Sequence, residues 1–123
     1  MRVRLSKTVT FNAAHHLPGL PESHKCHRLH GHTYKVEIIL EGVVDESTGM
    51  LVDYDDIAKA WAPLADILDH HLLNEIPYLE NPTTERLAAF LMDKLQVRLK
   101  CLASLKVYES ETTYCELRNE WRD

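Results

Sequence analysis

Histidine is concentrated in one short stretch of this sequence. Residues 24–36 read HKCHRLHGHTYKV and contain four of the chain's eight histidines and one of its three cysteines. Imidazoles gathered this closely are typical of metal ligands, of proton-transfer groups or of a polar loop. Which of these applies depends on the elements that carry the histidines.

Two alternating runs predict the strands on either side of this stretch. In the first run the apolar positions are Val3, Leu5, Val9 and Phe11, and in the second they are Tyr34, Val36, Ile38 and Leu40. Alternation of apolar and polar residues is the pattern of a half-buried strand. Extending the first run forwards places His15 on the apolar face, and extending the second backwards places His32 and His30 there.

If the two strands pair, the imidazoles of His15, His30 and His32 converge on one point. Three histidines without a fourth protein ligand form the usual catalytic zinc site with an open position. A closed structural site with Cys26 as the fourth ligand fits the same spacing. Hydrogen-bonded histidines that bind no metal are the third possibility.

Cys26 has basic and imidazole neighbours on both sides. They are His24, Lys25, His27 and Arg28. Positive charge around a cysteine stabilises its thiolate, which favours a reactive role over a purely structural one. We expect His16, His24 and His27 to be exposed loop residues.

Two further stretches place polar side chains among apolar ones. In ILDHHLLN, Asp69 precedes His70, and a carboxylate beside an imidazole suits proton transfer; histidines that meet a helix C-terminus are the alternative. In LKVYES, Glu109 shares a strand face with Leu105 and Val107. A carboxylate on that face needs a partner, either an arginine or the guanidine-like edge of a ligand.

The rest of the chain supplies two helices and two more strands. Spacing of apolar residues predicts a helix over 54–69, kinked at Pro63. ENPTTE predicts the start of a second helix, with Asn81 or Thr83 as N-cap and Pro82 in the first turn. Strands follow at 104–109 and 113–118. The order β-β-α-α-β-β predicts one α+β domain over residues 1–123, with an antiparallel sheet and two helices.

Composition narrows the class of protein. The chain has 123 residues and a net charge of −5, which disfavours non-specific nucleic-acid binding. It has no apolar run long enough to span a membrane and no apolar segment typical of a signal peptide. Its three cysteines contain no C-x-x-C, which is typical of a reducing compartment, so we expect a cytoplasmic protein.

Taken together, the motifs resemble one enzyme family over nearly the whole chain. FNAAH, a cysteine separated by three residues from His-Gly-His, LDHH, NPTTE and a strand-borne Glu109 occur in the order found in the 6-pyruvoyltetrahydropterin synthase and 6-carboxytetrahydropterin synthase family. The resemblance implies the tunnelling fold, in which subunit sheets join into a barrel. It also implies a homohexamer of two trimers with active sites between subunits.

The resemblance implies a role for each candidate residue. The zinc ligands are His15, His30 and His32. Cys26 is the catalytic thiol, and Asp69 with His70 completes its triad across a subunit boundary. Glu109 anchors the pterin ring, while Thr83 and Thr84 contact it. Lys25 and Arg28, with His24, are candidates for neutralising a triphosphate.

Spacing within the motif favours one branch of the family. Three residues separate Cys26 from His30, whereas the animal pattern has five, and the shorter spacing resembles bacterial 6-carboxytetrahydropterin synthases of queuosine biosynthesis. That branch implies conversion of 7,8-dihydroneopterin triphosphate to 6-carboxy-5,6,7,8-tetrahydropterin, with release of triphosphate and acetaldehyde. His27 departs from the branch, where a small residue such as glycine often stands. The alternatives are a 6-pyruvoyltetrahydropterin synthase and a non-enzymatic zinc module, closed by one cysteine and three histidines.

Overall fold

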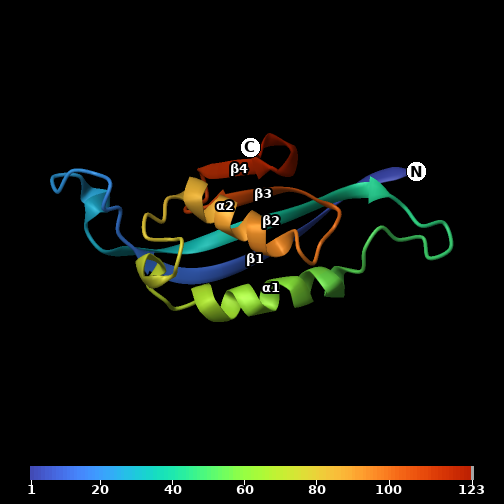
Figure 1. Cartoon of the computed structure of the whole chain (residues 1–123), viewed down its shortest axis with the longest axis horizontal. Coiled ribbons are helices and arrows are strands. Elements are labelled where there is room, and N and C mark those ends of the chain that lie inside the picture. Colours follow the sequence, from blue (N-terminus) through green and yellow to red (C-terminus); the bar gives the residue numbers. More distant parts are fainter. Residues whose placement is uncertain (123) are drawn as a thin grey trace.

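A four-stranded antiparallel sheet forms the body of the molecule, in the spatial order β1-β2-β3-β4 (Figure 1). The computed structural model describes residues 1–122. The strands are β1 (Arg2–His15), β2 (His30–Val43), β3 (Leu102–Tyr108) and β4 (Tyr114–Arg118). The helices are α1 (Tyr54–Leu68) and α2 (Thr84–Leu95), with short 3-10 turns η1 (Lys25–His27), η2 (Leu73–Glu75) and η3 (Asn119–Trp121). The predicted α+β class and element order are confirmed.

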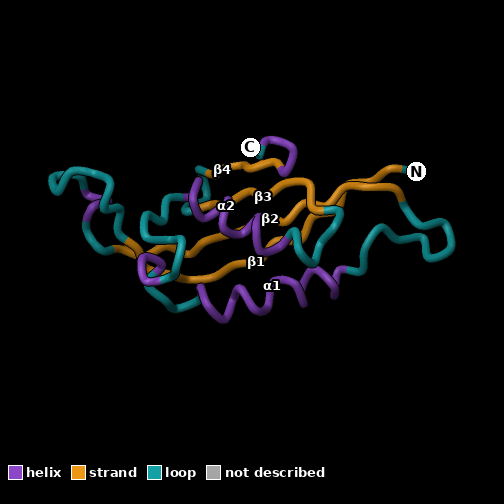
Figure 2. Tube along the Cα trace, in the orientation of Figure 1, coloured by secondary structure: helices purple, strands orange, loops and turns teal. Residues whose placement is uncertain are grey.

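Both helices cover the same face of the sheet, α1 against β1 and α2 against β3 and β4 (Figures 1 and 2). The apolar core lies between these two layers because the inward positions of the strands and the apolar stripes of both helices meet there. Its largest fully buried side chains include Phe11 and Tyr34, whose rings stack 4.9 Å apart. The opposite face of the sheet is polar, with Arg2 and Arg4 both paired to Glu41.

β1 and β2 pair over their whole length without a register shift. This register puts His15 opposite His30 and Ala13 opposite His32. The alternation therefore continues to the last residue of β1, where His15 is fully buried. The predicted positions of the three histidines on the core face are confirmed.

The element boundaries differ from the prediction at several points. α1 continues through Pro63, which lies on the exposed side, where water can bond the carbonyl that proline leaves free. Thr83 is the N-cap of α2, and its hydroxyl accepts the Arg86 N–H at 3.1 Å. Pro82 precedes the cap, so its predicted place in the first turn is wrong. β3 ends at Tyr108, which leaves Glu109 one residue beyond the strand.

The helices and the cysteines of the described residues bear on membrane spanning and on disulfide formation. These helices are too short or too polar to cross a membrane. These cysteines, Cys26, Cys101 and Cys115, are all free thiols.

Candidate metal centre and active site

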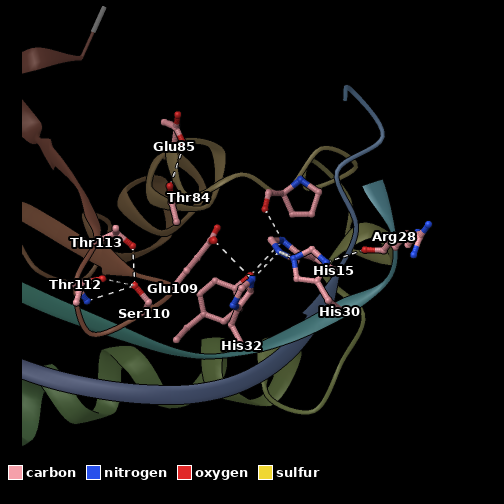
Figure 3. Close-up of polar contacts among 12 residues, drawn as sticks. His15, Arg28, His30, His32, Thr84, Glu85, Glu109, Ser110, Thr112 and Thr113 are labelled. Atoms are coloured by element: carbon pink, nitrogen blue, oxygen red, sulfur yellow. Dashed lines mark hydrogen bonds and ion pairs between the residues drawn. The ribbon is translucent and has the colours of Figure 1, made fainter. Parts of the chain in front are cut away.

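Three histidines meet where β1 ends and β2 begins (Figure 3). One ring nitrogen from each of His15, His30 and His32 lies within 4.8 Å of the others. The Nε2 atom of His15 is 3.0 Å from that of His30 and 3.1 Å from that of His32. The pairing register produces this cluster, because it brings the end of β1 and the start of β2 face to face.

Backbone carbonyls fix the orientation of two of the rings. His15 Nδ1–H donates to the Pro82 carbonyl at 2.9 Å, and His30 Nδ1–H donates to the Arg28 carbonyl at 2.7 Å. A carbonyl can only accept, so the Nε2 atoms of both rings carry lone pairs. Two lone pairs facing each other at 3.0 Å repel unless a cation lies between them. The donor set therefore fits a metal ion that imidazole binds well, such as zinc.

Burial favours the neutral form of two of the three imidazoles. It lowers the pKa of His15 to about 4. Burial also lowers the pKa of His32, although the Glu109 carboxylate nearby acts in the opposite direction. The hydroxyl of Tyr34, which lies 3.2 Å from His15 Nδ1, is fully buried, and its pKa is raised by this burial.

Glu109 lies beside the histidine cluster even though β3 ends one residue earlier. Its Oε2 atom is 3.6 Å from Nε2 of His32, and the carboxylate points toward the cluster in Figure 3. Of the two partners considered for this carboxylate, an arginine or the edge of a ligand, no arginine pairs with it among the described residues, where its ion-pair partner is the His32 imidazole. The carboxylate therefore keeps hydrogen-bonding capacity for a ligand.

Asp69 and His70 form a second polar group against the edge of β1. Asp69 Oδ2 lies 3.0 Å from His70 Nδ1, and Oδ1 accepts the Asn12 N–H at 2.8 Å. These two donors lower the pKa of Asp69, the backbone bond from Asn12 being the larger cause. His70 has a φ of 61° and donates its own N–H to the Asn12 carbonyl. Left-handed backbone at a non-glycine residue is sustained only by such surrounding contacts.

A cavity of about 570 Å³ lies beside this pair, and its lining includes His70, His71 and His32. Asn12 and Thr33 add polar groups to its wall, and the Thr33 hydroxyl donates to the Asn12 side chain at 2.6 Å.

Cys26 lies in η1, on the loop between β1 and β2, and is half-buried. Its carbonyl accepts the Leu17 N–H at 2.9 Å, and its own N–H donates to His24 Nδ1 at 3.1 Å. The thiol of Cys26 is outside the cluster of described residues whose ligand atoms lie within 4.8 Å.

The other histidines of this loop differ in exposure. His24 is exposed, as predicted. His27 is half-buried and donates from Nδ1 to the Leu20 carbonyl at 2.8 Å. His16 is half-buried too, because it follows the buried end of β1 directly. The prediction of exposed imidazoles at positions 16 and 27 is therefore wrong.

The remaining candidates lie around the cluster without contacting its imidazoles through their side chains. Lys25 and Arg28 are exposed, and the Arg28 guanidinium points away from the histidines (Figure 3). Thr83 caps α2, and the Thr84 hydroxyl donates to the Glu85 carboxylate at 2.9 Å.

The fold belongs to a known structural class. A solved 6-pyruvoyl tetrahydropterin synthase from Caenorhabditis elegans has a TM-score of 0.89 with this chain, at 24% identity. The similarity covers 97% of this chain and 96% of that one. The protein therefore has the tunnelling fold, as predicted.

Sequence comparison identifies the family within this class. The family model described as 6-pyruvoyl tetrahydropterin synthase matches residues 4–120, and the chain belongs to this family. A Synechocystis protein named 6-carboxy-5,6,7,8-tetrahydropterin synthase is 34% identical, over 87% of this chain and 86% of its own length. The human 6-pyruvoyl tetrahydrobiopterin synthase is 30% identical, over 97% of this chain and 93% of its own length. The protein is thus an enzyme of the pterin synthase type.

Proposed function

We propose that this protein converts 7,8-dihydroneopterin triphosphate to 6-carboxy-5,6,7,8-tetrahydropterin, with release of triphosphate and acetaldehyde. The observation that carries the proposal is the open cluster of His15, His30 and His32 beside the Glu109 carboxylate. The short spacing from Cys26 to His30 and the similarity to the Synechocystis enzyme favour the carboxy product. This activity belongs to queuosine biosynthesis.

In this proposal His15, His30 and His32 would hold zinc, which when bound would supply Lewis acidity for the removal of a proton from the substrate's side chain. Cys26 takes a proton there as a thiolate. His70, oriented through Nδ1 by Asp69, moves protons at its free Nε2 on the other face of the substrate. Glu109 accepts hydrogen bonds from the amino-pyrimidine edge of the pterin, which holds the side chain at the metal.

The exposure of His70 supports an active site shared between subunits. Its side chain is 78% exposed and lies against β1, whose second edge has no strand partner in the described sheet. A proton-transfer group on an open sheet edge can reach the loop of a neighbouring copy. We propose that the assembly is the homohexamer of two trimers that the family resemblance implies, in which Asp69 and His70 serve the partner's Cys26.

The proposal gives the peripheral residues secondary roles. Lys25 and Arg28 neutralise the triphosphate, because they are the exposed cations nearest to Cys26 in the sequence. Thr83 and Thr84 contact the ring at the start of α2. The free thiols fit a reducing compartment such as the cytoplasm.

A second candidate is the 6-pyruvoyltetrahydropterin synthase reaction, which eliminates triphosphate from the same substrate and keeps the three-carbon side chain. The human relative with that name, at 30% identity, supports it. The closed zinc module has less support, since the Cys26 thiol lies outside the compact group of metal-binding atoms.

Product analysis tests the proposal. The zinc-loaded protein is incubated with 7,8-dihydroneopterin triphosphate, the pterin is identified by mass spectrometry, and acetaldehyde is assayed. A carboxylated tetrahydropterin with acetaldehyde is the expected result. A pyruvoyl product without acetaldehyde would assign the second candidate. No turnover by a protein that holds zinc would contradict both, and His30→Ala provides the metal-deficient control.

A further inference from the structure

The side chain of Asn74 makes three hydrogen bonds, all to backbone atoms. Its Oδ1 atom accepts the His16 N–H at 3.0 Å. Its Nδ2 group donates to the His16 carbonyl at 2.8 Å and to the Glu80 carbonyl at 3.2 Å. An asparagine amide has two N–H donors, so both are used. Asn74 is half-buried in η2, and the proposed mechanism gives it no role.

These bonds join two segments that meet again at the metal centre. His16 follows His15 directly in the chain, and Glu80 lies two residues before Pro82. The bond from His15 Nδ1 to the Pro82 carbonyl, at 2.9 Å, closes the connection between the same two segments. Asn74 thus ties together the backbone on both sides of the contact that orients His15.

The neighbours of Asn74 make this connection rigid. Leu73, directly before it, and Leu79, directly before Glu80, are both fully buried in the core. Pro82 is also buried. With its anchors held in this way, Asn74 restrains the segment that carries the Pro82 carbonyl.

We propose that Asn74 is a positioning residue for the metal centre: it holds the Pro82 carbonyl against His15 Nδ1 and so keeps Nε2 of His15 unprotonated and directed at the metal. This inference rests on the proposed role of His15 as a ligand. Partners that orient a ligand in this way usually contribute about 10- to 100-fold to metal affinity.

The test compares Asn74→Ala and Asn74→Asp with Asn119→Ala. Asn119 is a matched control, because its amide also donates to a backbone carbonyl, that of Leu102 at 3.2 Å, and it is likewise half-buried. Zinc affinity is measured by competition with a chelator, without substrate. The tautomer of His15 is measured in the metal-free proteins by nitrogen-15 NMR of the imidazoles.

We expect Asn74→Ala to bind zinc about 10- to 100-fold more weakly than wild type. We also expect its His15 to lose the pure Nδ1–H tautomer, while Asn119→Ala keeps both properties. Asn74→Asp retains the acceptor for the His16 N–H but loses both N–H donors, so it should resemble Asn74→Ala. If Asn74→Ala does not fold, the same two measurements are made on Asn74→Asp. An unchanged His15 tautomer in the Asn74 variants, or an equal loss of zinc affinity in Asn119→Ala, would overturn the proposal.

Failure of the proposed function gives a different result. A protein that binds zinc but does not turn over the pterin triphosphate contradicts that function alone and leaves the role of Asn74 intact. A wild type that binds no zinc would contradict both, because the role of Asn74 at a metal centre requires His15 to be a ligand.

Discussion

The Nε2 atoms of His15 and His30 face each other at 3.0 Å, while the Nδ1–H group of each ring donates to a backbone carbonyl. This relationship defines the site, because two imidazole lone pairs at that separation need a shared cation. The pairing register of β1 and β2 thus brings the imidazoles together, and the carbonyls of Arg28 and Pro82 fix the orientation of two of the rings.

Asp69→Asn tests the proton-transfer pair. The amide cannot stabilise a charged His70 as the carboxylate does, so kcat should fall by roughly 10²- to 10⁴-fold, the usual contribution of general acid–base catalysis. Zinc content should not change, since neither residue belongs to the histidine cluster. His71→Ala is the control, because the His71 ring bonds the Asp69 carbonyl, at 2.8 Å, and not its carboxylate. Equal loss of kcat in both variants would argue against a specific role for the pair.

Glu109→Gln tests the proposed pterin anchor. The neutral amide loses a charge-assisted hydrogen bond to the pterin, which corresponds to roughly a 10- to 100-fold increase in KM. Steady-state kinetics on zinc-loaded protein measures this effect. Glu111→Gln, in the exposed turn that follows β3, should leave KM unchanged. A variant of Glu109 with normal KM would show that the carboxylate serves the His32 imidazole instead of the substrate.

Stability of the metal-free protein should depend on pH through His15. Its pKa is about 4 in the folded protein and about 6.5 in the unfolded chain, so the unfolded chain binds more protons between these values. The free energy of unfolding should therefore be constant above pH 6.5 with respect to this group. It should decrease as the pH falls from 6.5 to 4, by up to ~1.4 kcal/mol per pH unit.

Urea denaturation of wild type and His15→Gln at several pH values isolates this contribution. The variant lacks the group, so its stability should fall less steeply over the same range. His32 is present in both proteins, and burial lowers its pKa as well. The stability of His15→Gln should therefore still decrease somewhat as the pH falls. Parallel curves for the two proteins would exclude His15 as the cause.

The histidine cluster could be predicted from the sequence because strand parity is a local rule. Two alternating runs sufficed to place His15, His30 and His32 on one face, and an unbroken register preserved that relationship. Glu109 was assigned to the correct side of the sheet, although the strand ends before it. Its actual partner, His32, depends on the pairing of β2 with β3 and on the turn after Tyr108.

The groups that orient the site could not be predicted in the same way. Pro82 acts on His15 through a carbonyl oxygen, which every residue has, across 67 positions of sequence. Asn12 likewise holds Asp69 and His70 through its backbone N–H and carbonyl. Asn74 acts through its side chain, but one asparagine in a loop has no spacing that distinguishes it. These contacts follow from tertiary structure alone.

The most direct test of the central claim is the zinc content of purified Cys26→Ala, compared with wild type and His30→Ala. The claim is that three histidines hold the metal with an open position and that Cys26 is a reactive thiol outside the ligand set. Cys26→Ala should lose turnover yet retain zinc as wild type does, while His30→Ala should bind it at least ~100-fold more weakly. Loss of zinc from Cys26→Ala would make Cys26 a fourth ligand and contradict the claim.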